Sequence, residues 1–193
     1  TASLKGLVNG LDLAGTCMGV QAKDRIVTGD KIRPGDKIIG VSSTGVHSNG
    51  LSLARNIVEK YTDYDQKLSN GKTLGRELLT PTRIYHESLH VADTCTVHGM
   101  CHVTGGGLLN FLRLSKFGFR FDNPLTPPEI FRWIQETGKI SPIEMYRTFN
   151  MGMGFSYVVP ADAADKVTGM VPGAKVVGEV IEKPGAWLGD VQV

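Results

Sequence analysis

The spacing of apolar residues along the chain predicts a mixture of strands and helices. Short apolar or alternating runs predict strands at 37–41, 97–103, 117–121, 155–159 and 175–181, and weaker alternation predicts strands at 11–20 and 188–193. Apolar residues three or four positions apart predict helices at 51–60, 74–79, 83–93, 108–112, 127–138, 142–146 and 161–170. Because the two kinds of element interleave, we expect an α/β (α+β) layered sandwich, a mixed sheet covered by helices.

Residues at the expected helix ends refine these boundaries. Ser141 followed by Pro142 is typical of a capped helix start, and Thr126 followed by Pro127 predicts the same for the helix at 127–138. In the helix at 83–93, we expect Ile84, Leu89 and Ala92 to face inward.

Composition narrows the class of protein. The 193 residues are 41% hydrophobic and 21% charged, which suffices for a real core, and no interdomain linker is visible, so residues 1–193 are expected to form a single domain. A net charge of +2 without a basic run gives no reason to expect nucleic acid. No apolar run approaches ~20 residues, so no membrane span is expected. The odd count of three cysteines favours free thiols in a reducing, cytoplasmic setting.

A polar, glycine-containing loop joins the strand at 37–41 to the helix at 51–60. Hydroxyls, an imidazole and an amide crowd into residues 42–50. The unpaired N–H groups of a helix N-terminus suit phosphate, so the loop is a candidate anion site. The alternative is an ordinary loop in which Ser48 or Asn49 caps the helix.

Two further stretches, and one isolated acid, add candidate chemistry. Residues 104–107 read Thr-Gly-Gly-Gly between a strand and a helix, where three glycines favour close approach of backbone to a ligand or a neighbouring loop. A plain flexible turn is the alternative. Residues 147–154 precede a strand and carry an arginine and an asparagine. Asp12 is a weaker candidate, since turn or cap roles suit it equally.

Metal and nucleotide motifs are not evident. Cys95, His98, Cys101 and His102 offer zinc-binding atoms, but neighbours on a strand point to opposite faces, so no metal site is expected there. His86 and His90 lie four apart on a helix without a third ligand. The chain has no P-loop and no dinucleotide-binding glycine motif.

Five segments share their pattern with one known family. They read DLAG at 12–15, SSTGVHSNGLSL at 42–53, LTPTRIY at 79–85, HGMCHVTGGG at 98–107 and EMYRTFNMGMG at 144–154. In this order they resemble the C-terminal half of aminoimidazole ribonucleotide synthetase, also called phosphoribosylformylglycinamidine cyclo-ligase. The second and fourth segments also resemble the amidotransferase that acts one step earlier in purine synthesis.

The resemblance implies a fold and a reaction. The fold would be the family's C-terminal domain, with partial ferredoxin-like topology. The enzyme would use ATP and Mg²⁺, held mostly by an N-terminal half not seen here, to convert formylglycinamidine ribonucleotide into aminoimidazole ribonucleotide. The expected partners are that ribonucleotide, the N-terminal domain and a second subunit of a homodimer. This chain alone would be inactive.

The resemblance also selects site residues. Those expected to contact substrate or phosphate are Ser43, Thr44, His47, Ser48, Asn49, Thr104, Gly105, Gly106, Gly107, Arg147 and Asn150, with Asp12 weaker and His47 the candidate for catalysis. The alternatives are a stand-alone phosphate-binding or interaction module without ATP chemistry, or a related amidotransferase-type domain.

Overall fold

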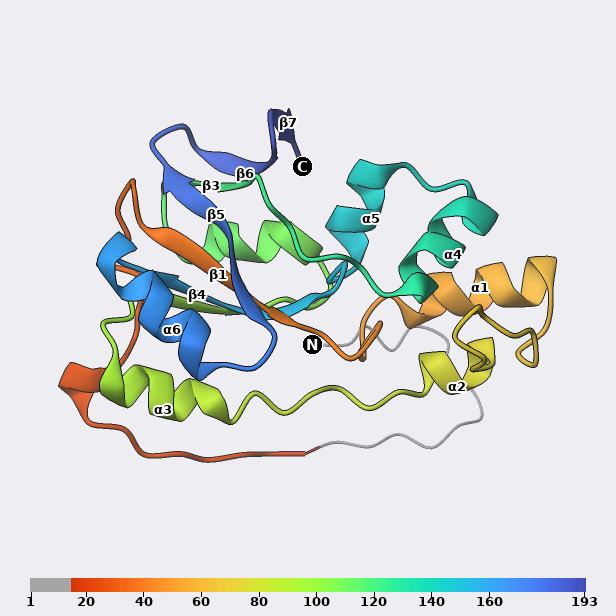
Figure 1. The fold of residues 1–193 in the computed structure, drawn as a ribbon, viewed down its shortest axis with the longest axis horizontal. Coiled ribbons are helices and arrows are strands. Elements are labelled where there is room, and N and C mark those ends of the chain that lie inside the picture. Colours follow the sequence, from red (N-terminus) through yellow and green to blue (C-terminus); the bar gives the residue numbers. More distant parts are fainter. Residues whose placement is uncertain (1–14) are drawn as a thin grey trace.

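A mixed seven-stranded sheet forms the centre of the part of the chain, residues 15–193, that the computed structural model describes (Figure 1). Its order is β2-β4-β1-β5-β3-β6-β7. β3 and β6 are parallel, and the other neighbours are antiparallel. The bounds are β1 Lys37–Ser42, β2 Gly99–His102, β3 Gly118–Phe121, β4 Met153–Val159, β5 Ala174–Ile181, β6 Gly185–Leu188 and β7 Val191–Gln192.

Six α-helices and three short 3-10 helices accompany the sheet in this described part. The α-helices are α1 Leu51–Tyr61, α2 Leu74–Leu78, α3 Glu87–Thr94, α4 Glu129–Gly138, α5 Pro142–Thr148 and α6 Ala164–Met170. The 3-10 helices are η1 Lys23–Arg25, η2 Gly107–Arg113 and η3 Ala161–Ala163. The helix expected at 108–112 is present as part of the 3-10 helix η2.

Four of the strands form a ferredoxin-like unit. The unit follows the split β-α-β pattern, with the chain order β1, helices, β2, β4, α6, β5. In space the order is β2-β4-β1-β5, so the third of these strands in the chain lies between the first and the second. All three contacts among them are antiparallel. The expected mixed sheet with partial ferredoxin-like topology is confirmed.

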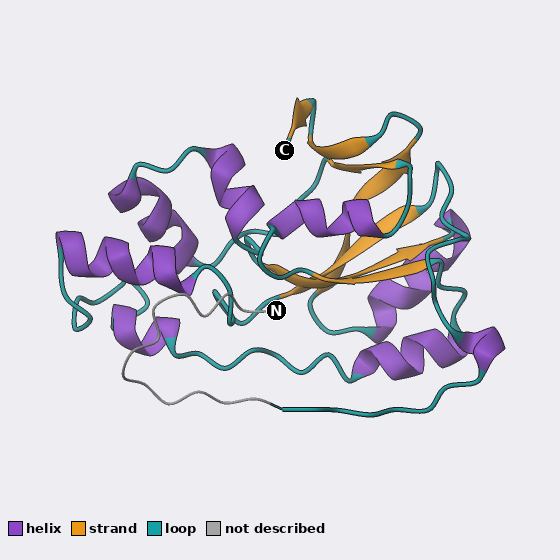
Figure 2. Cartoon of the chain, turned by 180° about the vertical axis from the view of Figure 1, so that it is seen from behind, coloured by secondary structure: helices purple, strands orange, loops and turns teal. Residues whose placement is uncertain are grey.

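Three apolar clusters hold the layers together. Ile38 and Val158 face one side of the sheet and pack with Phe111 of η2. Their neighbours Ile39 and Tyr157 face the other side, where α3 and α6 pack, as alternation along a strand requires. A third cluster joins α1, α2, α4 and α5. Figure 2 shows these four helices gathered beyond one end of the sheet.

The strand expected at 11–20 is wrong where the structure can test it. Residues 15–22 have no regular structure, and residues 15–26 are exposed. The alternation there is weak and rich in small residues, so it offers little apolar surface to bury. Residues 11–14, and with them Asp12, lie outside the described part of the chain.

The helix expected at 83–93 begins late. Residues 79–86 are irregular, and α3 starts at Glu87. Ile84 and Leu89, expected inside, are 81% and 73% exposed, whereas Val91 is buried. Arg83 explains the irregular segment, because its guanidinium donates to the carbonyl oxygens of Ser42 and Pro172 and also binds Glu87.

The helix caps agree with the sequence in one case and differ in another. Ser141 caps α5 by accepting from the Glu144 N–H at 3.3 Å, as expected. Thr126 does not cap α4, which begins at Glu129 after Pro128 without a side-chain cap. The closing strand expected at 188–193 is divided, with β6 ending at Leu188 and β7 covering Val191–Gln192.

Candidate functional site

The loop between β1 and α1 leaves the first turn of the helix without a side-chain cap. Gly50 occupies the N-cap position with φ 74° and makes no side-chain cap hydrogen bond, so the alternative in which Ser48 or Asn49 caps the helix is wrong. Thr44 and Ser48 are exposed. The Ser48 hydroxyl lies 3.3 Å from that of Thr82. The first N–H groups of α1 therefore stay available beside exposed hydroxyls.

His47 braces this loop from within. Its Nε2 accepts the backbone N–H of Thr44 at 3.1 Å, and the Thr44 hydroxyl donates to the carbonyl oxygen of Pro81 at 2.7 Å. An N–H can only donate, so Nε2 is unprotonated and a neutral ring carries its proton on Nδ1. Nδ1 is buried and has no partner among the described residues. Burial, followed by the nearby His102, lowers the pKa of His47 and favours this neutral form.

The three glycines at 105–107 approach neighbouring backbone and side chains closely. The Thr104 N–H and hydroxyl both donate to Asn110 Oδ1. Gly107, at φ 50°, lies against the carbonyl oxygen of Tyr146 with no room for a side chain. A Cβ added at Gly105 would lie 3.0 Å from Asn49 Oδ1. The 104–107 loop and the 42–50 loop are therefore in contact.

Asn150 ties the third stretch to the first. Its Nδ2 donates to the carbonyl oxygens of Gly45 at 2.9 Å and Val46 at 3.3 Å, and its Oδ1 accepts the Gly152 N–H. The Ser43 N–H donates to the Gly152 carbonyl oxygen. Arg147, on α5, is exposed. All three loops thus meet at the same end of the sheet, with Asn150 buried as a brace.

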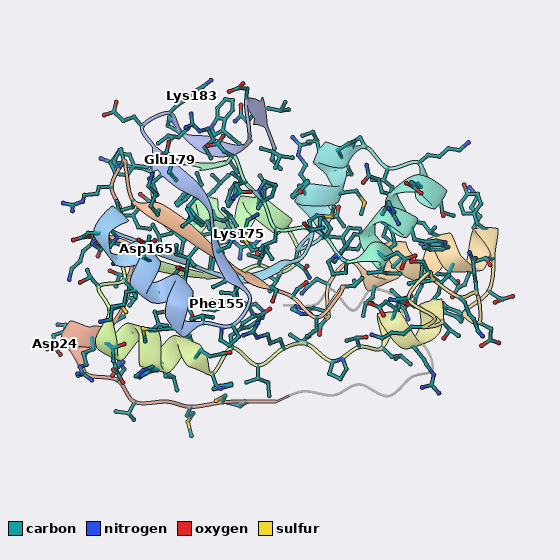
Figure 3. The ribbon with its side chains drawn as sticks, viewed as in Figure 1. Asp24, Phe155, Asp165, Lys175, Glu179 and Lys183 are labelled. Carbon is teal, nitrogen blue, oxygen red and sulfur yellow. The ribbon has the colours of Figure 1, made fainter. Side chains whose placement is uncertain are left out.

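An aromatic group beside His47 lies outside the set of site residues expected from the sequence. The rings of Tyr85 and Phe155 stack at 5.2 Å, and His102 meets Tyr85 edge-on at 5.9 Å. Phe155 extends from β4, where Figure 3 labels it. The Tyr85 ring lies 6.4 Å from that of His47, and burial raises the Tyr85 pKa to about 12. The LTPTRIY motif at 79–85 indicates Tyr85. The position of Tyr85 could not be predicted, because the sequence pattern predicts a helix at 83–93 where residues 79–86 are irregular.

The other histidine of the HGMCH segment has a structural partner. His98 is buried, and its Nδ1 lies 2.7 Å from Oδ2 of buried Asp36. Asp36 also accepts the Arg33 N–H. This pair joins the turn before β1 to the segment before β2, at the opposite end of the sheet from the loops.

The described residues hold neither a metal-binding cluster nor a membrane-spanning helix. No group of three or more His, Cys, Asp or Glu side chains is arranged to hold a metal ion in residues 15–193. Within the same range, every helix is too short or too polar to cross a membrane. Cys17, Cys95 and Cys101 are free thiols.

Comparison with known proteins gives a family match over most of the chain. A sequence model described as "AIR synthase related protein, C-terminal domain" matches residues 33–188. The chain is 51% identical over 185 residues to a phosphoribosylformylglycinamidine cyclo-ligase of Methanosarcina barkeri, and 49% identical to that of Methanosarcina acetivorans. In each case the match covers 94% of this chain and 55% of the relative, so the chain spans about half the length of these relatives.

A solved structure shares the fold. Thiamine monophosphate kinase from Aquifex aeolicus matches with a TM-score of 0.55 and 16% identity, over 86% of this chain and 54% of that one. At this identity the likeness concerns the fold alone.

Proposed function

This chain belongs to the family of AIR synthase related C-terminal domains, and from that membership we propose that it is the C-terminal domain of a cyclo-ligase of purine biosynthesis. The enzyme would convert formylglycinamidine ribonucleotide into aminoimidazole ribonucleotide. The observation that carries this proposal is identity near 50% over 94% of the chain to relatives named as that cyclo-ligase. We also propose that the enzyme acts in the cytoplasm.

We infer that residues 1–193 make one domain and that a further domain accounts for the remaining length of the relatives. That second domain would carry most of the ATP and Mg²⁺ contacts. The described residues do not fit a Mg²⁺ site, because no cluster of three metal-binding side chains occurs among them. ATP, when bound, would supply the phosphoryl group that activates the formyl oxygen. A homodimer is part of the same proposal.

The three meeting loops are the proposed substrate-phosphate site. Thr44, Ser48 and Asn49 offer polar side chains next to the uncapped N-terminus of α1, where partial positive charge favours an anion. The glycine loop adds backbone N–H groups, and exposed Arg147 adds a cation. Ser43, His47 and Asn150 would act behind this surface, since the Ser43 hydroxyl, the His47 ring and Asn150 are buried. Hydrogen-bond donors held in fixed positions stabilise the negative charge that develops during phosphate transfer.

Activity of the native gene product tests the proposal. We expect it to form aminoimidazole ribonucleotide from formylglycinamidine ribonucleotide only when ATP is present, as measured by diazo coupling of the product amine. The 193-residue chain alone should give no turnover while still binding the substrate. Binding of phosphate compounds without any turnover by the native gene product would instead support a phosphate-binding module.

A further inference from the structure

Two imidazoles lie beside the three loops, and they differ in access. His47 is only 6% exposed, its Nε2 is occupied by the Thr44 N–H, and its Nδ1 is enclosed. His102 is exposed. A group that exchanges a proton with substrate must come within hydrogen-bond reach of it. The His102 ring is exposed and open to such an approach, whereas the His47 ring is enclosed.

The position of His102 is set by the sheet. It is the last residue of β2, which is the edge strand of the order and pairs only with β4 in the described chain. The glycine loop begins two residues later, and Gly105 of that loop contacts Asn49. His102 therefore stands at the margin of the proposed phosphate site, with one side toward solvent.

The groups around His102 leave its ring neutral near pH 7. Partial burial lowers the pKa of His102 below its ordinary value. Tyr85, which faces it, stays protonated because its pKa is about 12. Phe155 from β4 carries no charge, and the Arg83 guanidinium over the Tyr85 ring is bound by Glu87. His47 also has a lowered pKa. A free lone pair on His102 is thus available at neutral pH.

We propose that His102 is a catalytic residue that accepts the proton released when the substrate ring closes. This rests on the proposed function. The amidine nitrogen forms a bond to the activated formyl carbon, and the carbon–oxygen bond to the phosphorylated oxygen breaks. Phosphate leaves with that electron pair, the proton on the attacking nitrogen passes to a ring nitrogen of His102, and water removes it afterwards. The edge-on contact with Tyr85 holds the imidazole in place.

The test compares His102→Gln with His90→Gln in the native gene product. His90 is an exposed histidine on α3, so it controls for loss of an imidazole elsewhere. We expect His102→Gln to lower kcat by about 10²–10⁴-fold, the usual contribution of general acid–base catalysis, with KM changed by less than about threefold. The acidic limb of the pH–rate profile should disappear. His90→Gln should match the wild type.

A second variant separates proton transfer from packing. In His102→Ala, the exposed position lets free imidazole enter, and added imidazole should restore part of kcat. Rescue by imidazole supports the proposal. An unchanged kcat and acidic limb in His102→Gln would overturn it, and so would a large rise in KM with kcat intact. Absence of ring-closed product from the wild-type gene product would instead overturn the proposed function, and this inference with it.

Discussion

The backbone of His47 lies in the left-handed region, at φ 63°, which costs a non-glycine residue of order 1–3 kcal/mol. Two buried polar atoms in the same loop, His47 Nδ1 and Ser43 Oγ, have no partner among the described residues. An unpaired buried group of this kind costs about 1–3 kcal/mol. The loop therefore holds an unfavourable arrangement, which Asn150 and the His47–Thr44 hydrogen bond stabilise.

Protonation of His102 should affect the protonation of His47. A positive charge on His102 contributes to the lowered pKa of His47, after burial. We therefore expect His102→Gln to move the His47 pKa upward, toward the ordinary value of about 6.5. Histidine ring NMR signals followed from pH 8 to pH 5 measure this, with His90→Gln as the control. If His47 titrated identically in both variants, the two rings would not be coupled.

Neighbouring glycines should respond differently to alanine. Gly107 has a positive φ and faces the Tyr146 carbonyl oxygen, so Gly107→Ala should cost at least about 3 kcal/mol of stability. Gly105 lacks a positive φ, and its added Cβ would only displace Asn49. Gly105→Ala should cost less than about 1 kcal/mol yet weaken substrate binding. Urea unfolding and substrate titration distinguish the two variants. Similar losses of stability in Gly105→Ala and Gly107→Ala would contradict the difference expected from their contacts.

At the scale of elements, strands and helices with strong patterns agree with the sequence. β1, β3 and β5 carry concentrated apolar residues, and α1 has a clear apolar face. The segment at 79–86 could not be predicted this way, because tertiary hydrogen bonds from Arg83 override its helical pattern. The same limit applies to the site. Local sequence indicates the three loops. Tyr85 and His102 meet because β2 pairs with the distant β4, whose Phe155 stacks on Tyr85.

Ser141 and Thr126, the two helix-cap residues expected from the sequence, give a matched pair of variants. Ser141 accepts a hydrogen bond at the start of α5, so Ser141→Ala should destabilise the protein by about 1 kcal/mol. Thr126 makes no such bond to α4, and Thr126→Ala should change stability by less than about 0.5 kcal/mol. Thermal unfolding of both variants measures the difference. A larger loss for Thr126→Ala would mean that α4 is capped there after all.

At the scale of the whole molecule, His47 and His102 link stability to pH. His47 and His102 have pKa values lowered by burial, so the unfolded chain binds more protons than the folded chain just below pH 6.5. Their contribution is complete above that pH and is lost as the pH falls through the folded-state values. The free energy of unfolding should therefore decrease between pH 7.5 and pH 5.5.

Denaturant unfolding at both pH values checks this expectation. His47→Asn should reduce the pH dependence, because the buried site no longer excludes a proton. His90→Gln removes an exposed histidine and should leave the dependence unchanged. An equal change of stability with pH in His47→Asn and the wild type would show that other groups cause it.

The chain leaves the four-strand unit after β2 and re-enters it at β4 through almost the same point. The Val103 N–H donates to the Gly154 carbonyl oxygen at 2.9 Å, so the intervening residues 104–152 form an insert with adjacent ends. The strand of that insert, β3, pairs with β5 at the outside of the unit. Its helices α4 and α5 lie beyond the end of the sheet, whereas η2 packs against one face of it. Because the two ends of the insert are adjacent, its length can change without breaking the β2–β4 pairing. The glycine loop and Arg147 lie in this insert, whereas His47 and His102 lie outside it. Changes within the insert can therefore alter one half of the loop cluster while both histidines keep their places.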